Sequence, residues 1–170
     1  METQHDHLYK VRHSLAHVLA QAVLQIRPTA KLAFGPPVDN GCYYDFLFDV
    51  SLTPEDFADI EKRIRKIINE RQPFVGSSLT TEEATQRLEA AGQYLKVEYC
   101  RELTERGEKT IGFYSNGTFV DMCAGPHLEH TGQIPPDCFK LDSIAGAYWR
   151  GSEKNPQLAR LYCLALCFAS

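Results

Sequence analysis

His13-Ser14-Leu15-Ala16-His17 lies in the middle of a run of apolar residues that recur with helical spacing. The apolar positions are Leu8, Val11, Leu15, Val18, Leu19, Val23 and Ile26. Residues that recur every three or four positions share one face of a helix, so this run predicts a helix over about residues 8–26, ending before Pro28. His13 and His17 are one turn apart and flank the apolar face. They are therefore expected where the core meets a cleft.

A second stretch, Asp121-Met122-Cys123-Ala124-Gly125-Pro126-His127, repeats the four-residue interval. Gly125-Pro126 bars a regular helix, so Cys123 and His127 are predicted to lie on a tight turn. Each pair alone is typical of boundary side chains bonded to backbone, whereas two pairs with equal spacing favour one common site. Three histidines and one cysteine suit tetrahedral zinc, and the same four groups could equally bind a polar substrate without a metal ion.

A hairpin leads into the second stretch. Asn116-Gly117 is a strong two-residue turn signal between apolar segments at residues 110–115 and 118–123. Because strand side chains alternate, Asp121 and Cys123 project from the same face. If that face covers the first helix, Asp121 can hold a histidine tautomer or orient a substrate amine. The alternative is a strand-end carboxylate in water.

The remaining patterns predict an α+β fold, with an antiparallel sheet packed against helices. The other predicted strands are residues 31–34, 42–48, 74–79, 94–100 and 139–149. The other predicted helices are residues 54–70, residues 81–91 and the segment after Asn155-Pro156. We expect one domain over residues 1–170, with residues 1–7 disordered and residues 152–170 forming a C-terminal helix or tail.

Composition excludes several protein classes. The 170 residues are 44% hydrophobic and 24% charged, as in ordinary globular domains, which argues against a disordered chain. No apolar run approaches about 18 residues and the start is polar, so neither a membrane span nor a signal peptide is predicted and a cytoplasmic protein is expected. Six scattered cysteines are expected to be mostly reduced thiols. A net charge of −4 argues against coating nucleic acid, although a local basic patch could hold the end of an RNA.

Taken with two further stretches, these motifs resemble the editing domain of threonyl-tRNA synthetase. The added stretches are LAFGPPVDNGCYYDF at residues 32–46 and AGAYWRG at residues 145–151. The resemblance covers roughly residues 8–162. The paired His and Cys motifs also occur in alanyl-tRNA synthetase editing domains and their free-standing relatives, while the added stretches are typical of the threonyl branch. The aminoacylation core is absent, so an enzyme that charges tRNA is not expected.

The resemblance implies a hydrolase that removes serine mischarged onto threonine tRNA, by water attack on the ester at the 3′-terminal adenosine. It also assigns a role in the hydrolytic site to Lys96, which its residue type alone would predict to be a solvated side chain. The catalytic residues it implies are His13, Lys96 and Asp121. The substrate-binding residues it implies are His17, Tyr44, Cys123 and His127. If zinc is bound, its ligands would be His13, His17, Cys123 and His127; alanyl relatives are expected to bind zinc and threonyl ones to work without it.

Several alternatives stay open. The chain could be a free-standing deacylase that acts in trans, which the starting Met1 favours, or an editing domain excised from a synthetase. It could also be a non-catalytic module that binds metal or tRNA and partners a threonyl-tRNA synthetase, or a metallo-hydrolase of small esters. One position departs from the family, which commonly has arginine where this chain has Ala124. The expected partner is the tRNA acceptor end carrying serine, and the oligomeric state is open.

Overall fold

The computed structural model describes residues 1–166, and its centre is the helix α1 (Gln4–Ile26). The predicted helix is confirmed, but it begins at Gln4 rather than near Leu8. The side chain of Thr3 accepts a hydrogen bond from the Asp6 N–H, and the Asp6 carboxylate accepts one from the Thr3 N–H. This capping box satisfies N–H groups that would otherwise lack partners. The prediction of disorder over residues 1–7 is therefore wrong from residue 4 onward.

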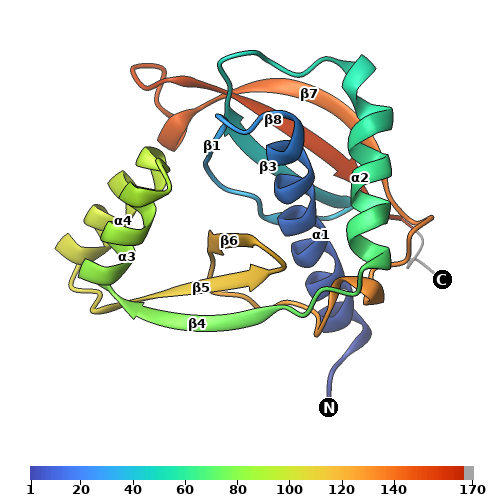
Figure 1. The fold of residues 1–170 in the computed structure, drawn as a ribbon, viewed down its shortest axis with the longest axis horizontal. Coiled ribbons are helices and arrows are strands. Elements are labelled where there is room, and N and C mark those ends of the chain that lie inside the picture. Colours follow the sequence, from blue (N-terminus) through green and yellow to red (C-terminus); the bar gives the residue numbers. More distant parts are fainter. Residues whose placement is uncertain (167–170) are drawn as a thin grey trace.

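A five-stranded antiparallel sheet packs against α1 and α2 (Phe57–Asn69), as Figure 1 shows. Its strand order is β1-β3-β8-β7, with β2 paired to β3. The bounds are β1 (Lys31–Leu32), β2 (Pro37–Val38), β3 (Gly41–Leu47), β7 (Lys140–Tyr148) and β8 (Gln157–Leu164). Alternation along β3 turns Tyr44 and Phe46 into the core beside α1, so this sheet and the two helices form the largest hydrophobic cluster.

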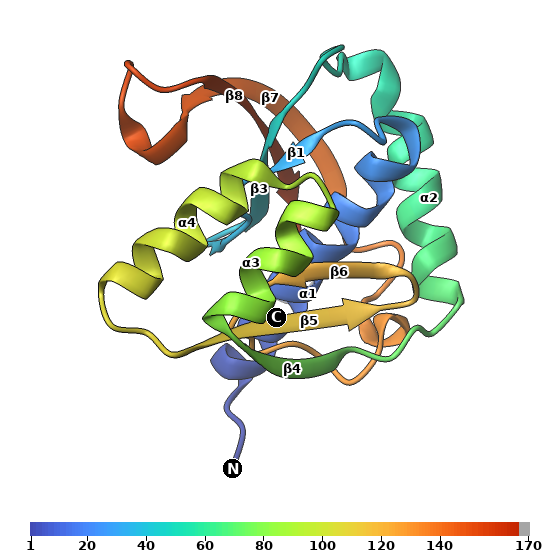
Figure 2. The same ribbon diagram turned by 60° about the vertical axis from the view of Figure 1, so that its left-hand side comes forward.

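A second antiparallel sheet of three strands lies beside the first helix. Its order is β4-β5-β6, from β4 (Val75–Thr80), β5 (Thr110–Asn116) and β6 (Phe119–Met122). The predicted Asn116-Gly117 hairpin is confirmed, with Gly117 at φ +56°. Helices α3 (Thr81–Ala90) and α4 (Tyr94–Glu105) pack on this sheet at the end away from α2 (Figure 2). The fold is thus α+β, as the sequence predicts.

The segment at residues 94–100 is helical, and the strand prediction for it is wrong. Helix α4 lies between two apolar clusters, so it buries side chains on two sides. Val97 and Cys100 pack toward α3 and β5, whereas Leu95 packs beside Trp149. Apolar residues on both sides of a short helix imitate the alternation of a strand. Lys96 therefore stands on a helix rather than on a strand.

The prediction of a C-terminal helix over residues 152–170 is also wrong within the described residues. Residues 157–164 form β8, the strand between β3 and β7. Leu158 joins the cluster around Trp149, whereas Leu161 and Cys163 join the main core on the other face. Because the buried face changes along the strand, its apolar positions show the three-residue interval of a helix.

Two further expectations are met. In the described part of the chain, no helix is long and apolar enough to cross a membrane. Among the described residues, the free thiols are Cys42, Cys100, Cys123 and Cys163.

Candidate functional site

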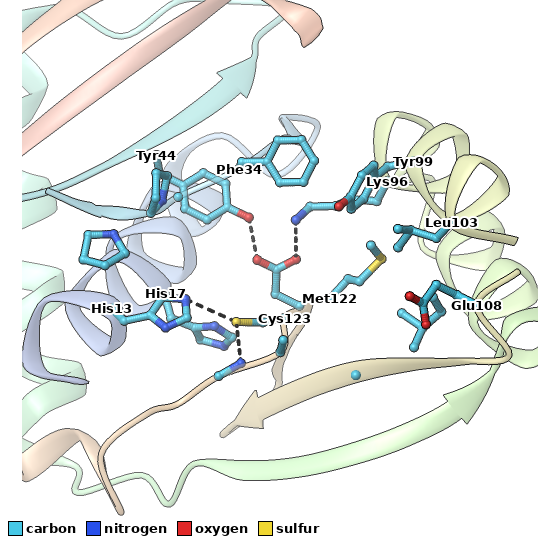
Figure 3. A pocket seen from close by; sticks show the side chains of 18 of the residues that line it. His13, His17, Phe34, Tyr44, Lys96, Tyr99, Leu103, Glu108, Met122 and Cys123 are labelled. Atoms are coloured by element: carbon cyan, nitrogen blue, oxygen red, sulfur yellow. Dashed lines mark hydrogen bonds and ion pairs between the residues drawn. The ribbon is translucent and has the colours of Figure 1, made fainter. Parts of the chain in front are cut away.

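A pocket of about 570 Å³ opens where α1, α4, the β5-β6 hairpin and the loop before β3 meet. Figure 3 shows the side chains that line it. The Tyr44 hydroxyl and the Lys96 ammonium both point into the pocket from opposite sides, and the His13 and His17 side chains lie with Cys123 at one end. The pocket thus gathers residues from both sheets and from two helices.

Asp121 is the centre of the polar part of this pocket. Its carboxylate accepts a hydrogen bond from the Tyr44 hydroxyl at 2.5 Å and lies 3.4 Å from the Lys96 Nζ. The side chains of Lys96 and Asp121 are only 3% and 7% exposed. A charge that leaves water is stabilised only if it is paired and hydrogen-bonded, so each of these two ions requires the other. Asp121 is thereby fixed between α4 and β3, not solvated at a strand end.

Packing holds both partners of Asp121. The ring of Phe34 lies under the Lys96 ammonium, with Nζ 4.9 Å from the ring centroid, a favourable cation–π contact. Tyr44 packs against Gly35, where an added Cβ would lie 2.1 Å from the tyrosine ring. Only glycine leaves room for the Tyr44 ring in this position. The Tyr44 side chain is therefore both a core residue and a hydroxyl donor.

The second polar group is formed by His13, Cys123 and His127. The Cys123 Sγ lies 3.3 Å from the His13 Nε2 and 3.4 Å from the His127 Nε2. The His13 Nδ1 lies 3.1 Å from the carbonyl oxygen of Pro126. A carbonyl oxygen only accepts hydrogen bonds, so the His13 Nδ1 carries the proton. In the neutral ring the Nε2 is then an acceptor that faces the pocket.

His127 is held in the interior by ring contacts and by one hydroxyl. It stacks on Phe74 with centroids 5.1 Å apart, and its Nδ1 lies 3.4 Å from the Ser14 Oγ. The same Oγ accepts a hydrogen bond from the Leu128 N–H. Burial lowers the pKa of His127 to about 2. The ring is therefore neutral at physiological pH.

His17 lies next to this group but does not join it. Its ring makes edge contacts with Phe119 and with His127, and burial lowers its pKa to about 3. The three residues whose donor atoms all lie within 4.8 Å of one another are His13, Cys123 and His127. Of the four ligands predicted for zinc, the structure therefore brings together three and places His17 behind them. Its Nε2 has no hydrogen-bond partner among residues 1–166.

These three donors suit a zinc ion. A tetrahedral zinc with Zn–S of about 2.3 Å and Zn–N of about 2.0 Å holds neighbouring ligand atoms about 3.5 Å apart, close to the two distances around Cys123. Zinc-binding histidines usually bond their other ring nitrogen to a second group. His13 does so with Pro126, and His127 lies within reach of Ser14. The cluster could hold a metal ion and leave one coordination position for solvent or substrate.

Three titratable side chains near the ion pair are uncharged, namely His13, Cys123 and Tyr44. Burial lowers the pKa of His13, raises the pKa of the Cys123 thiol, and raises the pKa of Tyr44 well above its usual value. His13 is therefore a neutral imidazole near pH 7, and Cys123 is a thiol rather than a thiolate. Lys96 and Asp121 are the buried ion pair of the pocket, and Glu108 is a further acidic residue that lines it.

Comparison with known proteins identifies relatives of this chain. A family model described as the threonyl and alanyl tRNA synthetase second additional domain matches residues 111–162, which contain Asp121, Cys123 and His127. A threonine–tRNA ligase of Borreliella burgdorferi strain ZS7 is 45% identical over 157 residues, which are 92% of this chain and 26% of that protein. The threonine–tRNA ligase of Acetivibrio thermocellus is 50% identical over 151 residues, 89% of this chain and 23% of that protein. Residues 111–162 of the chain belong to the threonyl and alanyl tRNA synthetase second additional domain family.

The chain spans about a quarter of the length of the curated relatives it matches. A third relative, the threonine–tRNA ligase of Gloeobacter violaceus, is 43% identical over 157 residues, 92% of this chain and 25% of that protein. The similarity to threonine–tRNA ligases thus extends well beyond the part matched by the family model. The activities of those whole proteins are therefore proposals for this chain.

Sequence reasoning missed several residues of the site. Phe34, Ser14 and the Pro126 carbonyl contact the predicted residues, but nothing in their type or spacing marks them. The AGAYWRG stretch, which carries part of the family resemblance, contains Trp149. The structure places Trp149 in the core at 1% exposure, and it does not line the pocket. Ala124 does line the pocket and is exposed.

The buried histidines predict how the stability of this domain depends on pH. His17 and His127 have pKa values of about 3 and about 2 in the folded chain, against 6.5 in an unfolded one. Between these values the unfolded chain binds the extra protons, so the free energy of unfolding is highest above pH 6.5 and falls as the pH drops. The expected slope is about 1.4 kcal/mol per pH unit for each histidine. Urea unfolding at pH 5 and pH 7 measures this difference.

A matched pair of variants isolates the histidine contribution from that of the carboxylates. His17→Gln removes one buried imidazole and should make the difference between pH 5 and pH 7 smaller. His7→Gln changes an exposed histidine on the same helix and should leave that difference as in the wild type. Equal pH dependence in all three proteins would contradict the assignment.

Proposed function

We propose that this domain hydrolyses the ester of a mischarged aminoacyl-tRNA, most specifically seryl-tRNA for threonine. The observation that carries the proposal is the meeting, in one pocket, of an imidazole acceptor with a buried ammonium–carboxylate pair. The membership of residues 111–162 in a family named for threonyl and alanyl tRNA synthetases supports tRNA as the partner. An ester next to a free amine offers a carbonyl to attack, a cation to bind and an alkoxide to release.

His13 is the proposed general base. Its Nε2 accepts a proton from a water molecule, and the water oxygen attacks the carbonyl carbon of the ester. The imidazole is neutral near pH 7 because burial lowers its pKa, and the Pro126 carbonyl holds the tautomer in which Nε2 is the acceptor. When the bond to the ribose oxygen breaks, the proton returns from His13 to that oxygen. The products are the amino acid and a tRNA with a free hydroxyl.

Lys96 and Asp121 are proposed to act on the charges of the substrate. An ammonium has three donors, so the contact of Lys96 with Asp121 leaves others for the carbonyl oxygen as it gains negative charge. A carboxylate oxygen accepts more than one hydrogen bond, so Asp121 can also orient the substrate amine. Tyr44, His17 and His127 would shape the wall of the pocket around these groups.

Cys123 is not proposed as a covalent nucleophile. Burial raises the pKa of its thiol, and the reactive form of cysteine is the thiolate. The Sγ instead accepts a hydrogen bond from the Gly125 N–H and lies between two imidazoles. Cys123 is therefore proposed to position His13 and His127. A bound water molecule is the attacking group.

Zinc offers a second route through the same residues. His13, Cys123 and His127 would hold the ion, and zinc would supply a Lewis acid that polarises the ester and lowers the pKa of bound water. The Nε2 of His13 has one lone pair, so it can serve as a base or as a zinc ligand, but not as both. The proposal assigns that lone pair to the base.

A second candidate function is a non-catalytic module that binds tRNA and partners a synthetase. The observation that favours it is Ala124, an exposed residue at the pocket where the resembled family commonly has arginine. Removing a guanidinium there weakens the attraction for phosphate or substrate. Binding of tRNA without turnover would select this candidate. Cleavage of small esters that lack RNA would instead indicate a general esterase.

The first functional prediction concerns selectivity. The domain should hydrolyse seryl-tRNA for threonine about 10- to 200-fold faster, in kcat/KM, than the threonyl ester, because a close-packed wall rejects one added methyl group. The proposed rigid part of that wall is Tyr44 and the turn at Gly125-Pro126, of which Gly125 lines the pocket. Deacylation of the two charged tRNAs measures the ratio. Equal values would contradict the selectivity, and a preference for alanyl-tRNA would assign the domain to the alanyl branch.

The second functional prediction concerns the base. His13→Ala should lower kcat by about 10²- to 10⁴-fold, the usual contribution of a general base. His13 is only partly buried, so little packing is lost and the urea midpoint should change little. His7→Ala, on the same helix and exposed, is the control and should keep wild-type turnover. Near-normal turnover in His13→Ala would remove the proposed base.

The third functional prediction concerns metal. Treatment with a chelator, followed by measurement of zinc content, should leave the deacylation rate of the stripped protein within about two-fold of the untreated one, since His13 acts as a base without metal. A rate that falls on chelation and returns with added zinc would favour the zinc route. Cys123→Ala then tests whether the three-donor cluster holds the ion, through the stoichiometry of zinc binding.

A further inference from the structure

Helix α4, which carries Lys96, is tied to the turn between β7 and β8 by two adjacent residues. The Trp149 Nε1–H donates a hydrogen bond to the Glu98 carboxylate at 3.2 Å. The Arg150 guanidinium donates to the Glu102 carboxylate at 2.7 Å, and both of these side chains are about one-third exposed. Glu98 and Glu102 are one helical turn apart, so both bonds reach the same face of α4.

A continuous set of ring contacts runs from this turn to the ammonium of Lys96. The Trp149 ring stacks on Phe34, with centroids 5.4 Å apart and planes 11° from parallel. Phe34 in turn lies under the Lys96 Nζ at 4.9 Å, and its ring meets Tyr99 of α4 edge-on at 4.9 Å. The Arg150 guanidinium covers the Tyr99 ring at 5.1 Å. Trp149 thus contacts Phe34, which contacts Lys96, and Arg150 contacts Tyr99, which contacts Phe34. Neither Trp149 nor Arg150 lines the pocket.

The backbone of this turn has positive φ at two successive residues. Arg150 has φ +58° and ψ +23°, the left-handed region that residues with a Cβ seldom adopt, and Gly151 follows at φ +71°. A left-handed conformation is unfavourable for an arginine because its Cβ approaches the following carbonyl oxygen. Such a conformation persists where the surroundings hold it. Here the bond from the Arg150 guanidinium to Glu102 provides that support, along with the bond from the Asn155 amide to the Trp149 carbonyl.

We propose that Trp149 and Arg150 are positioning residues that set the place of Lys96 opposite Asp121. The inference rests on the proposed function for its kinetic consequences. The Lys96–Asp121 pair spans 3.4 Å between α4 and β6, so a small movement of α4 lengthens it. Because reacting groups must be aligned within a fraction of an ångström, loss of the turn should reduce the rate of the chemical step while the substrate still binds.

The kinetic test uses Arg150→Ala, which removes the bond to α4 and leaves Trp149 in the core. We expect kcat for seryl-tRNA to fall by about ten-fold while KM stays within about two-fold. Arg101→Ala is the matched control, because Arg101 makes an exposed ion pair from the same helix to Glu89 of α3. It should change neither constant. A rise in KM with unchanged kcat would overturn the proposal and show instead that Arg150 contacts the RNA.

A double variant separates positioning from general loss of stability. In a Lys96→Met background, Arg150→Ala should lower kcat no further, because the group that it positions is gone. An undiminished ten-fold loss in that background would overturn the proposal. Trp149→Phe keeps a ring against Phe34 but removes the indole N–H. Trp149→Phe alone should lower kcat less than the double variant that combines it with Arg150→Ala.

A measurement that needs no enzyme activity keeps the two proposals distinguishable. Acetylation of lysines by a small activated ester, followed by mass spectrometry, reports access to each amine. Lys96 is 2% exposed and should react slowly in the wild type and several-fold faster in Arg150→Ala. Lys62 and Lys66 on α2 serve as internal references. Faster Lys96 labelling in a protein without deacylase activity would support the positioning role and refute the proposed function, whereas unchanged labelling would overturn the positioning role.

Discussion

The ion pair between Lys96 and Asp121 is the constraint on which the rest of the site depends. Two opposite charges lie 3.4 Å apart and almost out of reach of water. Each ion would be strongly unfavourable alone, since breaking a buried pair by removing one partner usually costs about 3–5 kcal/mol. The Tyr44 hydroxyl bonds to the same carboxylate. One short contact region therefore fixes the relative positions of α4, β6 and β3.

The neutral groups follow from the same low polarity. A site that excludes water enough to protect one ion pair also lowers the pKa of every nearby imidazole and raises that of the thiol. The low polarity keeps the His13 imidazole deprotonated, so its Nε2 can accept a proton. His13 also has the bond from Nδ1 to Pro126, which selects its tautomer. His17 and His127 are buried further and contribute neutral ring surface.

The sequence was sufficient where a local pattern determined the structure. The apolar spacing around His13, the Asn116-Gly117 turn and the paired motifs led to α1, to the hairpin and to the three-donor cluster. The sequence prediction failed for α4 and β8. Each of these segments packs against two different surfaces, so the spacing of its apolar residues reflects both surfaces. The contact of Tyr44 with Asp121 joins residues 77 positions apart, and no local signal marks such a pair.

The arrangement of hydrophobic clusters explains why the site is sensitive to distant packing. One cluster holds α1 and β3, a second holds α4 with the three-stranded sheet, and the third, around Trp149, lies against α4 and β8. His13 and Tyr44 stand on α1 and β3 of the first cluster, whereas Lys96 stands on α4, which packs into both the second and the third. The geometry between the proposed base and the ammonium is thus set by how these clusters pack together. If the proposed positioning role holds, a substitution beside Trp149 alters that geometry without touching the pocket, and the proposed activity then depends on packing beyond the residues that line it.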